Sequence, residues 1–140
     1  MIKFPAKITY SKKDKCYLVD FPDLPGCNTY GDSIDEAINY AKEALSGFLE
    51  SINLRELDLP NPTKLNGKDI YFIEPDNNIS FAIWLKKTRI KKGYTQKELA
   101  KLLNIPYQSY QRYENPKITN PTLKRISQIE DVLEEKIVAI

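Results

Sequence analysis

Hydrophobic residues alternate with polar ones in the first part of the chain and later recur at every third or fourth position. Alternation is typical of strands, and the longer period is typical of helices that bury one face. The first half therefore predicts three strands, a helix and a fourth strand, at residues 2–10, 16–21, 27–30, 33–52 and 68–74. This order indicates an α+β layer in which one helix covers a small sheet.

Local features refine this half of the chain. Pro5 has no backbone N–H to donate, so the first strand is expected to lie at a sheet edge or to be irregular there. Two prolines and a glycine within residues 22–27 predict a tight turn. Ser33 and Glu36 have the spacing of a capping box, in which the hydroxyl accepts from a first-turn amide and the carboxylate bonds back. Residues 53–67 contain two prolines and are predicted to be loop.

The second half shows only helical spacing. It predicts four helices, at residues 79–92, 96–103, 107–114 and 122–133. The short polar stretch 75–78 separates the halves, so we expect two domains, 1–75 and 76–140. The second is expected to be all-α, and the side chains expected to face its core are Ile79, Ala82, Ile83, Leu85 or Lys86, Ile90, Leu99, Ala100, Leu102, Leu103, Leu123, Ile126, Ile129, Val132 and Leu133.

Charge separates the two halves further. The chain has 140 residues and a formal net charge of +2, from 21 basic and 19 acidic side chains. Residues 1–75 carry nine basic and twelve acidic side chains, whereas residues 76–140 carry 12 basic and 7 acidic ones. The second half thus has the electrostatics of a polyanion binder.

The residue inventory excludes several kinds of site. The chain has no histidine, so it lacks a histidine general base, a Ser-His-Asp triad and an imidazole metal ligand. Cys16 and Cys27 are too few for a four-thiolate zinc site. A disulfide between them is the alternative to free thiols, and a cytosolic context disfavours it.

No apolar run approaches the roughly 20 residues of a membrane span, and the first ten residues lack the apolar core of a signal peptide. We expect a cytoplasmic protein that binds no membrane.

Carboxylates near the early strands raise the alternative of a metal-dependent hydrolase. Asp20 lies in a predicted strand, Asp23 in the proline turn and Asp14 at a lysine-rich hairpin tip, while Glu36 and Glu43 lie on the polar side of the helix. These groups are not expected to converge. We therefore predict that the chain is not an enzyme and has no catalytic residue, no metal and no cofactor.

A capped short helix, a turn of about four residues and a second short helix make the helix-turn-helix geometry. The segment GYTQKELAKLLNIPYQSYQRYENP resembles the Cro/lambda-repressor type of this motif. The positions that carry the resemblance are Thr95, Gln96, Leu99, Ala100, Ile105, Gln108 and Glu114. Asn104 replaces the glycine common at the turn, and asparagine tolerates the left-handed conformation.

The resemblance implies double-stranded DNA as a partner. The side chains that it assigns to DNA are Gln96, Tyr107, Gln108, Ser109, Gln111 and Arg112. In that family the residue at Gln96 contacts phosphate and braces the reading helix. Gln108 and Arg112, together with Tyr107, are expected to read bases, since glutamine pairs bidentately with adenine and arginine with guanine. The remaining two are expected at phosphates or flanking bases, and a plain solvated surface is the alternative for the glutamines.

The first half resembles the HicB antitoxin family. The resemblance lies in FPDLPGCNTYGDSIDEAINYAKEAL, with its Asp-Leu-Pro-Gly turn at 23–26, Gly31-Asp32 and Glu36-Ala37. The two resemblances cover nearly the whole chain in the order of HicB proteins with a C-terminal helix-turn-helix. They imply a partial ribonuclease H-like N-terminal domain, a small HicA toxin that degrades mRNA and is held inactive by this domain, and repression of the toxin–antitoxin operon.

Charge and exposed position make Asp20 and Asp23 candidates for toxin binding, since an acidic domain suits a basic RNA-cleaving partner. One short reading helix makes few contacts, and proteins of this kind read two half-sites about one DNA turn apart. We therefore expect a homodimer or a larger assembly, with the apolar segment 136–140 as a candidate interface or as ordinary packing. The other function left open is a free-standing transcriptional regulator whose N-terminal domain senses a ligand or a protein.

Overall fold

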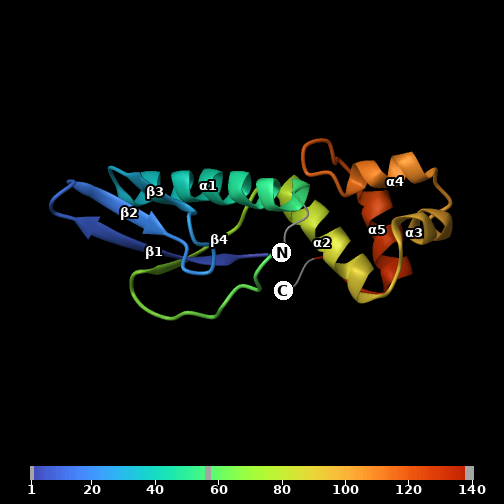
Figure 1. The fold of residues 1–140 in the computed structure, drawn as a ribbon, viewed down its shortest axis with the longest axis horizontal. Coiled ribbons are helices and arrows are strands. Elements are labelled where there is room, and N and C mark those ends of the chain that lie inside the picture. The colour runs from blue at the N-terminus through green and yellow to red at the C-terminus, as the bar shows by residue number, and fades with distance from the viewer. Residues whose placement is uncertain (1, 56–57, 138–140) are drawn as a thin grey trace. The chain divides into compact units, whose positions relative to one another are not determined.

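The computed structural model describes residues 2–55 and 58–137, in two compact units, Ile2–Asp76 and Asn77–Ile140 (Figure 1). We call them the N-terminal unit and the C-terminal unit. The N-terminal unit contains β1 (Phe4–Ser11), β2 (Cys16–Asp20), β3 (Asn28–Gly31), α1 (Ile34–Leu54) and β4 (Ile70–Ile73). The C-terminal unit contains α2 (Asn77–Lys91), α3 (Gln96–Leu102), α4 (Tyr107–Tyr113) and α5 (Leu123–Leu133).

The strands of the N-terminal unit form one antiparallel sheet in the order β3-β2-β1-β4. This confirms the α+β prediction, and Figure 1 shows α1 running along the sheet. β1 lies between β2 and β4 and is therefore not an edge strand, but around Pro5 it is paired on one side only, which agrees with the expectation of an edge or an irregularity there. Pro5 is tolerated because β2 is short: the pairing with β2 begins at Lys7, so Pro5 faces only Phe72 of β4.

One face of the sheet packs against α1. Phe4, Ala6 and Ile8 of β1 are buried, as is Val19, which pairs with Ile8. From α1 the buried residues recur every four positions, at Ala37, Ala41, Leu45 and Leu49. The helix starts where the sequence predicts, because the Ser33 hydroxyl oxygen accepts a hydrogen bond of 3.1 Å from the Glu36 N–H.

Gly31 allows α1 to approach the sheet closely. A Cβ atom at this position would lie 2.5 Å from the backbone nitrogen of Ala37 and 2.8 Å from its Cα atom. We expect Gly31→Ala to destabilise the chain by about 1–3 kcal/mol in urea denaturation, the usual cost of overpacking.

Gly47 provides the matched control, since it is an exposed glycine within α1 where an added Cβ meets no atom within 4 Å. Gly47→Ala is expected to raise the free energy of unfolding by about 0.5–1 kcal/mol, because alanine favours helix interiors. Equal stability of Gly31→Ala and the unmodified chain would contradict the close approach.

The helices of the C-terminal unit surround one buried cluster. It consists of Phe81, Leu85, Leu99, Ala100, Leu103, Tyr110, Ile129 and Leu133. Three residues expected in this core are instead exposed: Ile90 by 58%, Leu102 by 53% and Leu123 by 85%. Ile90 follows the buried Leu85 by five residues, which turns it away from the face that packs. Leu123 is the first residue of α5, one turn before the half-buried Ile126.

Cys16 and Cys27 are buried free thiols. Burial, with a contribution from the charge of Asp20, raises the pKa of the Cys27 thiol to about 11. This thiol therefore stays protonated at neutral pH.

Within 2–55 and 58–137 we find no helix that combines the length and apolar character needed to cross a membrane.

Candidate nucleic-acid interface

The two central helices of the C-terminal unit form a capped helix, a turn and a second helix. Thr95 and Glu98, three residues apart, make a complete capping box at the start of α3. In the turn Asn104 has a φ of 56°, the left-handed conformation that the sequence allows there. The Ile105 N–H donates to the Ala100 carbonyl at 3.0 Å, and Ile105 packs against the core. These contacts fix the direction in which α4 begins.

The helix α4 has one buried and one exposed face. Tyr110 is fully buried, and the half-buried Tyr113 packs against the core. The exposed side chains are those of Tyr107, Gln108, Ser109, Gln111 and Arg112. Tyr107 lies one helical turn before Gln111, and Gln108 lies one turn before Arg112, so these four side chains share a face. The structure thus brings five of the six predicted DNA-binding side chains onto one exposed helix.

A buried ion pair attaches the end of α4 to α2. Arg89 Nε donates to Glu114 Oε2 at 2.7 Å, and Arg89 Nη2 donates to Glu114 Oε1 at 3.1 Å. The Tyr110 hydroxyl donates to Glu114 Oε2 at 2.5 Å, and Arg89 Nη1 donates to the Tyr94 carbonyl at 3.0 Å. Arg89 and Glu114 are only 9% and 6% exposed. Glu114 therefore holds α4 through charged hydrogen bonds away from water.

The burial of this network shifts the pKa values of two of its members. Burial, reinforced by the negative charge of Glu114, raises the pKa of the Tyr110 hydroxyl far above its usual range. Burial works to lower the pKa of Arg89, but the hydrogen bonds to Glu114 and its charge outweigh burial and raise it. Tyr110 is therefore a constant donor and Arg89 a constant cation across physiological pH.

Gln96, the sixth predicted DNA-binding residue, joins this network instead of the exposed face. Its Nε2 donates to Glu114 Oε1 at 3.1 Å, and its Oε1 accepts from the Tyr107 hydroxyl at 3.3 Å. Lys97 Nζ lies 5.4 Å from the centre of the Tyr107 ring, a cation–π distance. Gln96 thus braces both ends of α4.

The ion pair of Arg89 with Glu114 escaped the sequence interpretation, although Glu114 belongs to the matched motif. Arg89 stands among buried residues on α2, next to the buried Thr88, four residues after Leu85. The sequence does contain a signal for this ion pair, because Arg89 lies at helical spacing from the core residue Leu85. It indicates a partner elsewhere in the core, because buried charges are nearly always paired.

The two acidic candidates of the N-terminal unit differ in their surroundings. Asp20 is exposed at the end of β2 and pairs in register with Lys7 of β1 and Asn28 of β3. Its strand neighbour Val19 is buried towards α1, so Asp20 points to the opposite face of the sheet. Asp23 is half-buried and accepts hydrogen bonds from the Thr63 N–H at 2.9 Å and the Thr63 hydroxyl at 3.0 Å. It therefore holds the loop before β4, whereas Asp20 is free to face a partner.

In the described part of the chain, no three acidic or cysteine side chains gather as potential metal ligands. Asp14, Asp20 and Asp23, which are all described, thus do not form such a ligand group.

Two family models match the chain. A model described as "HicB_like antitoxin of bacterial toxin-antitoxin system" matches residues 4–96, and a helix-turn-helix model matches residues 85–140. Antitoxin HicB of Escherichia coli (strain K12) is 31% identical over 115 residues, covering 81% of each chain. Antitoxin HicB 2 of Photorhabdus laumondii is 28% identical over 111 residues, covering 79% of this chain and 76% of the relative. The crystal structure of the Burkholderia Pseudomallei antitoxin HicB matches at a TM-score of 0.48 and 22% identity, covering 56% of this chain and 67% of that one.

Proposed function

The chain belongs to the HicB-like antitoxin family of bacterial toxin–antitoxin systems, and from this premise we propose that it neutralises a HicA-like mRNA-degrading toxin and represses its own operon. In this proposal the N-terminal unit binds the toxin and the C-terminal unit binds double-stranded operator DNA. The protein acts by binding alone, without catalysis, as membership of an antitoxin family and a helix-turn-helix suggest. It works in the cytoplasm, where mRNA and the operon are found.

The observation that carries the DNA-binding role is the division of α4 into two faces. Tyr110 and Glu114 anchor the helix from within, and Gln108, Gln111 and Arg112 stand on its exposed side. A short helix fixed in this way presents amide and guanidinium groups to base edges in the major groove. Gln108 and Arg112 are the proposed base readers, with Tyr107 beside them.

Phosphate contacts surround this helix in the proposal. Ser109 and Gln111 lie at its flank, and Lys97 and Lys101 are exposed around the hollow that Asn104 and Tyr107 also line. Lysines beside a reading helix neutralise phosphates and release counterions, so affinity for DNA falls as salt rises. The Gln96 side-chain nitrogen carries two hydrogens, and one of them bonds to Glu114. In the proposal, the second hydrogen donates to a phosphate. Two copies bind together, since two half-sites supply the contacts that one short helix lacks.

Toxin binding is assigned to the N-terminal unit. Its element order, three strands, a helix and a strand, supports the proposal of a partial ribonuclease H-like fold. The excess of acidic residues in residues 1–75 suits a partner that must be basic to hold RNA. Asp20 is the proposed contact because its carboxylate is exposed. Asp23 contributes indirectly, by holding the loop at Thr63.

Co-expression with the neighbouring small open reading frame tests the antitoxin role. We expect that frame to arrest growth alone, and the chain to restore growth and to co-purify with its product. Asp20→Lys is expected to weaken the complex at least tenfold in calorimetry. Glu43→Lys, the same charge change at an exposed site on α1, is the matched control. A neighbouring product that neither arrests growth nor binds would favour a free-standing regulator.

A further inference from the structure

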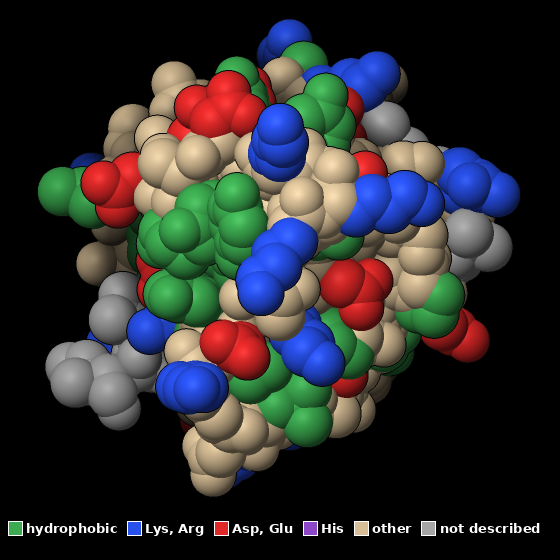
Figure 2. All heavy atoms as spheres, turned by 90° about the vertical axis from the view of Figure 1, so that its left-hand side faces the viewer, with side chains coloured by type: hydrophobic (Ala, Val, Ile, Leu, Met, Phe, Trp, Pro, Cys, Tyr) green, Lys and Arg blue, Asp and Glu red, His purple; other side chains and the backbone are tan. Residues whose placement is uncertain are grey.

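The turn between β1 and β2 is a basic end of the otherwise acidic N-terminal unit. Lys12, Lys13 and Lys15 are exposed within four residues of chain. Among the described residues, none of these three lysines has a carboxylate within 4.0 Å, whereas Lys3 of the same unit lies 3.6 Å from Glu74. Figure 2 looks at the N-terminal unit from the side of this turn and shows basic side chains beside a hydrophobic patch, with acidic ones among them. The turn therefore presents three cations that no internal ion pair neutralises.

Polar groups of the turn itself fix its shape. The Ser11 hydroxyl donates to Asp14 Oδ2 at 3.1 Å and accepts from the Asp14 N–H at 3.1 Å. Lys15 has a φ of 54°, the left-handed conformation, directly before β2 begins. The carboxylate within the turn is thus engaged with the turn, while the lysine side chains extend into solvent.

Two tyrosines stand next to the turn. Tyr10 and Tyr17 are cross-strand partners, adjacent to the last pair before the turn, Ser11 and Cys16. Their rings meet edge to face with centroids 5.1 Å apart, and Tyr10 is 54% exposed. A ring that is held by a neighbour and still open to solvent is a surface on which a base can stack. We call Tyr10, Lys12, Lys13 and Lys15 the hairpin end.

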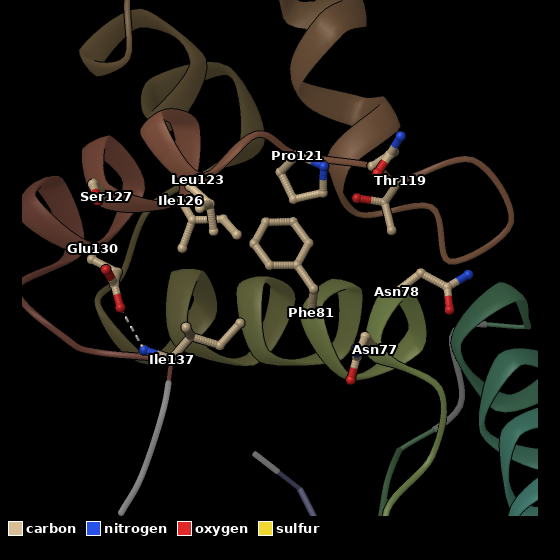
Figure 3. A pocket seen from close by; sticks show the side chains of 11 residues that line it. Asn77, Asn78, Phe81, Thr119, Pro121, Leu123, Ile126, Ser127, Glu130 and Ile137 are labelled. Carbon is tan, nitrogen blue, oxygen red and sulfur yellow. Dashed lines mark hydrogen bonds between the residues drawn. The ribbon is translucent and has the colours of Figure 1, made fainter.

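A hollow in the C-terminal unit also offers room for a ligand. It has a volume of about 720 Å³ and lies between α2, the loop that follows α4, and α5. Figure 3 shows the ring of Phe81 pointing from α2 towards Pro121 and Ile126. Among the residues that line the hollow only Glu130 is charged, and its carboxylate already accepts from the Ile137 N–H at 2.9 Å. The hollow therefore offers no cation to a polyanion, whereas the hairpin end does.

We propose that the hairpin end binds single-stranded nucleic acid, with phosphates at its lysines and an unpaired base stacked on the ring of Tyr10. Sites for single strands combine cations that follow the backbone with aromatic rings that take the bases. A duplex keeps its bases stacked inside, so a ring at the tip of a hairpin suits an unpaired base. The inference goes beyond the proposed function and does not depend on it, because it uses neither α4 nor Asp20.

The acidic residues proposed for toxin binding lie away from the hairpin end. β2 begins beside the turn and ends at Asp20, and Asp23 follows beyond it. A strand bound at the turn therefore leaves the carboxylate of Asp20 accessible. Asp32 lies on the turn side, since it follows Gly31, which pairs with Tyr17. Its charge repels phosphates, so Asp32→Asn should tighten the binding of a single strand about twofold.

Fluorescence anisotropy of the full chain with a labelled oligouridylate of about 12 nucleotides is the first test. Lys12→Ala combined with Lys13→Ala should weaken binding at least tenfold. It should also reduce the salt dependence by about 1.4, because each phosphate contact on a single strand contributes about 0.7. Both side chains are exposed, so the variant should fold normally by circular dichroism.

Lys7→Ala combined with Lys64→Ala is the matched control. It removes the same charge from the same unit, but Lys7 pairs in register with Asp20, and Lys64 follows Thr63, which bonds to Asp23. Binding of the oligouridylate should change by less than about twofold. Equal losses in the two double variants would show that only the net charge matters and would overturn the site.

The ring of Tyr10 is tested separately. Tyr10→Ala should weaken binding at least fivefold, and Tyr10→Phe should retain most of the affinity, because stacking needs the ring and not its hydroxyl. Tyr40→Ala, at a tyrosine that is 43% exposed on α1, should bind like the unmodified chain. Equal affinity of Tyr10→Ala and the unmodified chain would overturn the stacking.

Two further arms identify the ligand and the unit that binds it. An oligothymidylate of the same length shows whether the strand can be DNA as well as RNA. Lys101→Ala, in the C-terminal unit, should leave the affinity for both single strands unchanged. If affinity falls in Lys101→Ala and not in the variants of the hairpin end, or if the unmodified chain binds neither single strand, the proposal is wrong.

Discussion

Arg89→Ala is expected to lower the free energy of unfolding by about 3–5 kcal/mol, the cost of removing one member of a buried ion pair. The substitution leaves the carboxylate of Glu114 buried without the Arg89 guanidinium, while the Tyr110 hydroxyl and the Gln96 amide still donate to it. Because Glu114 follows directly after α4, this helix should lose its attachment to α2 at the same time. Urea denaturation followed by circular dichroism measures the loss.

Lys91→Ala is the control for this prediction. Lys91 lies on the same helix and also pairs with a glutamate, Glu135, at 2.6 Å, but its side chain is 69% exposed. Exposed pairs contribute about 0–1 kcal/mol, so this variant should remain close to the unmodified chain. The double variant Arg89→Met with Glu114→Leu should recover much of the stability, because an apolar pair leaves no charge buried. A loss below about 1 kcal/mol in Arg89→Ala would refute the role of the ion pair.

Gln108→Ala and Arg112→Ala are each expected to reduce the preference of the chain for its own promoter by about 1–3 kcal/mol, roughly 5- to 150-fold in affinity ratio. Both side chains are exposed on α4, so neither substitution should alter stability. Fluorescence anisotropy on promoter and scrambled duplexes, at one fixed salt concentration, measures the ratio. The loss should appear on the promoter and be small on the scrambled duplex, because a base contact carries sequence preference.

Two controls define what this result means. Gln128→Ala changes an exposed glutamine on α5 and should leave the ratio unchanged. Lys101→Ala should weaken binding to both duplexes alike and reduce the salt dependence, as a phosphate contact does. If Gln108→Ala and Arg112→Ala keep full preference while folded, the reading face of α4 is misassigned.

The sequence predicted the elements well because their patterns are local. The alternation around Phe4, Ala6 and Ile8 and the capping residues Ser33 and Thr95 depend only on neighbours along the chain, and the structure confirms them. The position of β1 within the sheet depends on pairing with β4, more than sixty residues away, so the sequence did not show that β1 is a central strand that is open on one side only around Pro5.

The sequence predicted the exposed residues of the candidate site, but it did not predict the buried ion pair that holds α4 in place. One short motif was enough to predict that Tyr107, Gln108, Ser109, Gln111 and Arg112 share a helix, and the structure places all five exposed on α4. The ion pair of Arg89 with Glu114 joins residues 25 positions apart, and no local period reveals it. Leu123 was expected in the core because it fits the helical period of α5. That period identifies the apolar face of a helix, but it does not show which turns of that face pack against another element.

The two-faced arrangement of α4 has a consequence for how this protein can change over generations. The inward residues Tyr110 and Glu114 are buried and attach α4 to the rest of the unit, while its exposed residues lie outside the buried cluster. In the proposed function, substitutions at Gln108, Gln111 or Arg112 therefore alter which DNA is recognised while the unit stays folded. Under that proposal, a duplicated copy of the gene can acquire a new operator through a few exposed positions while its buried residues stay the same.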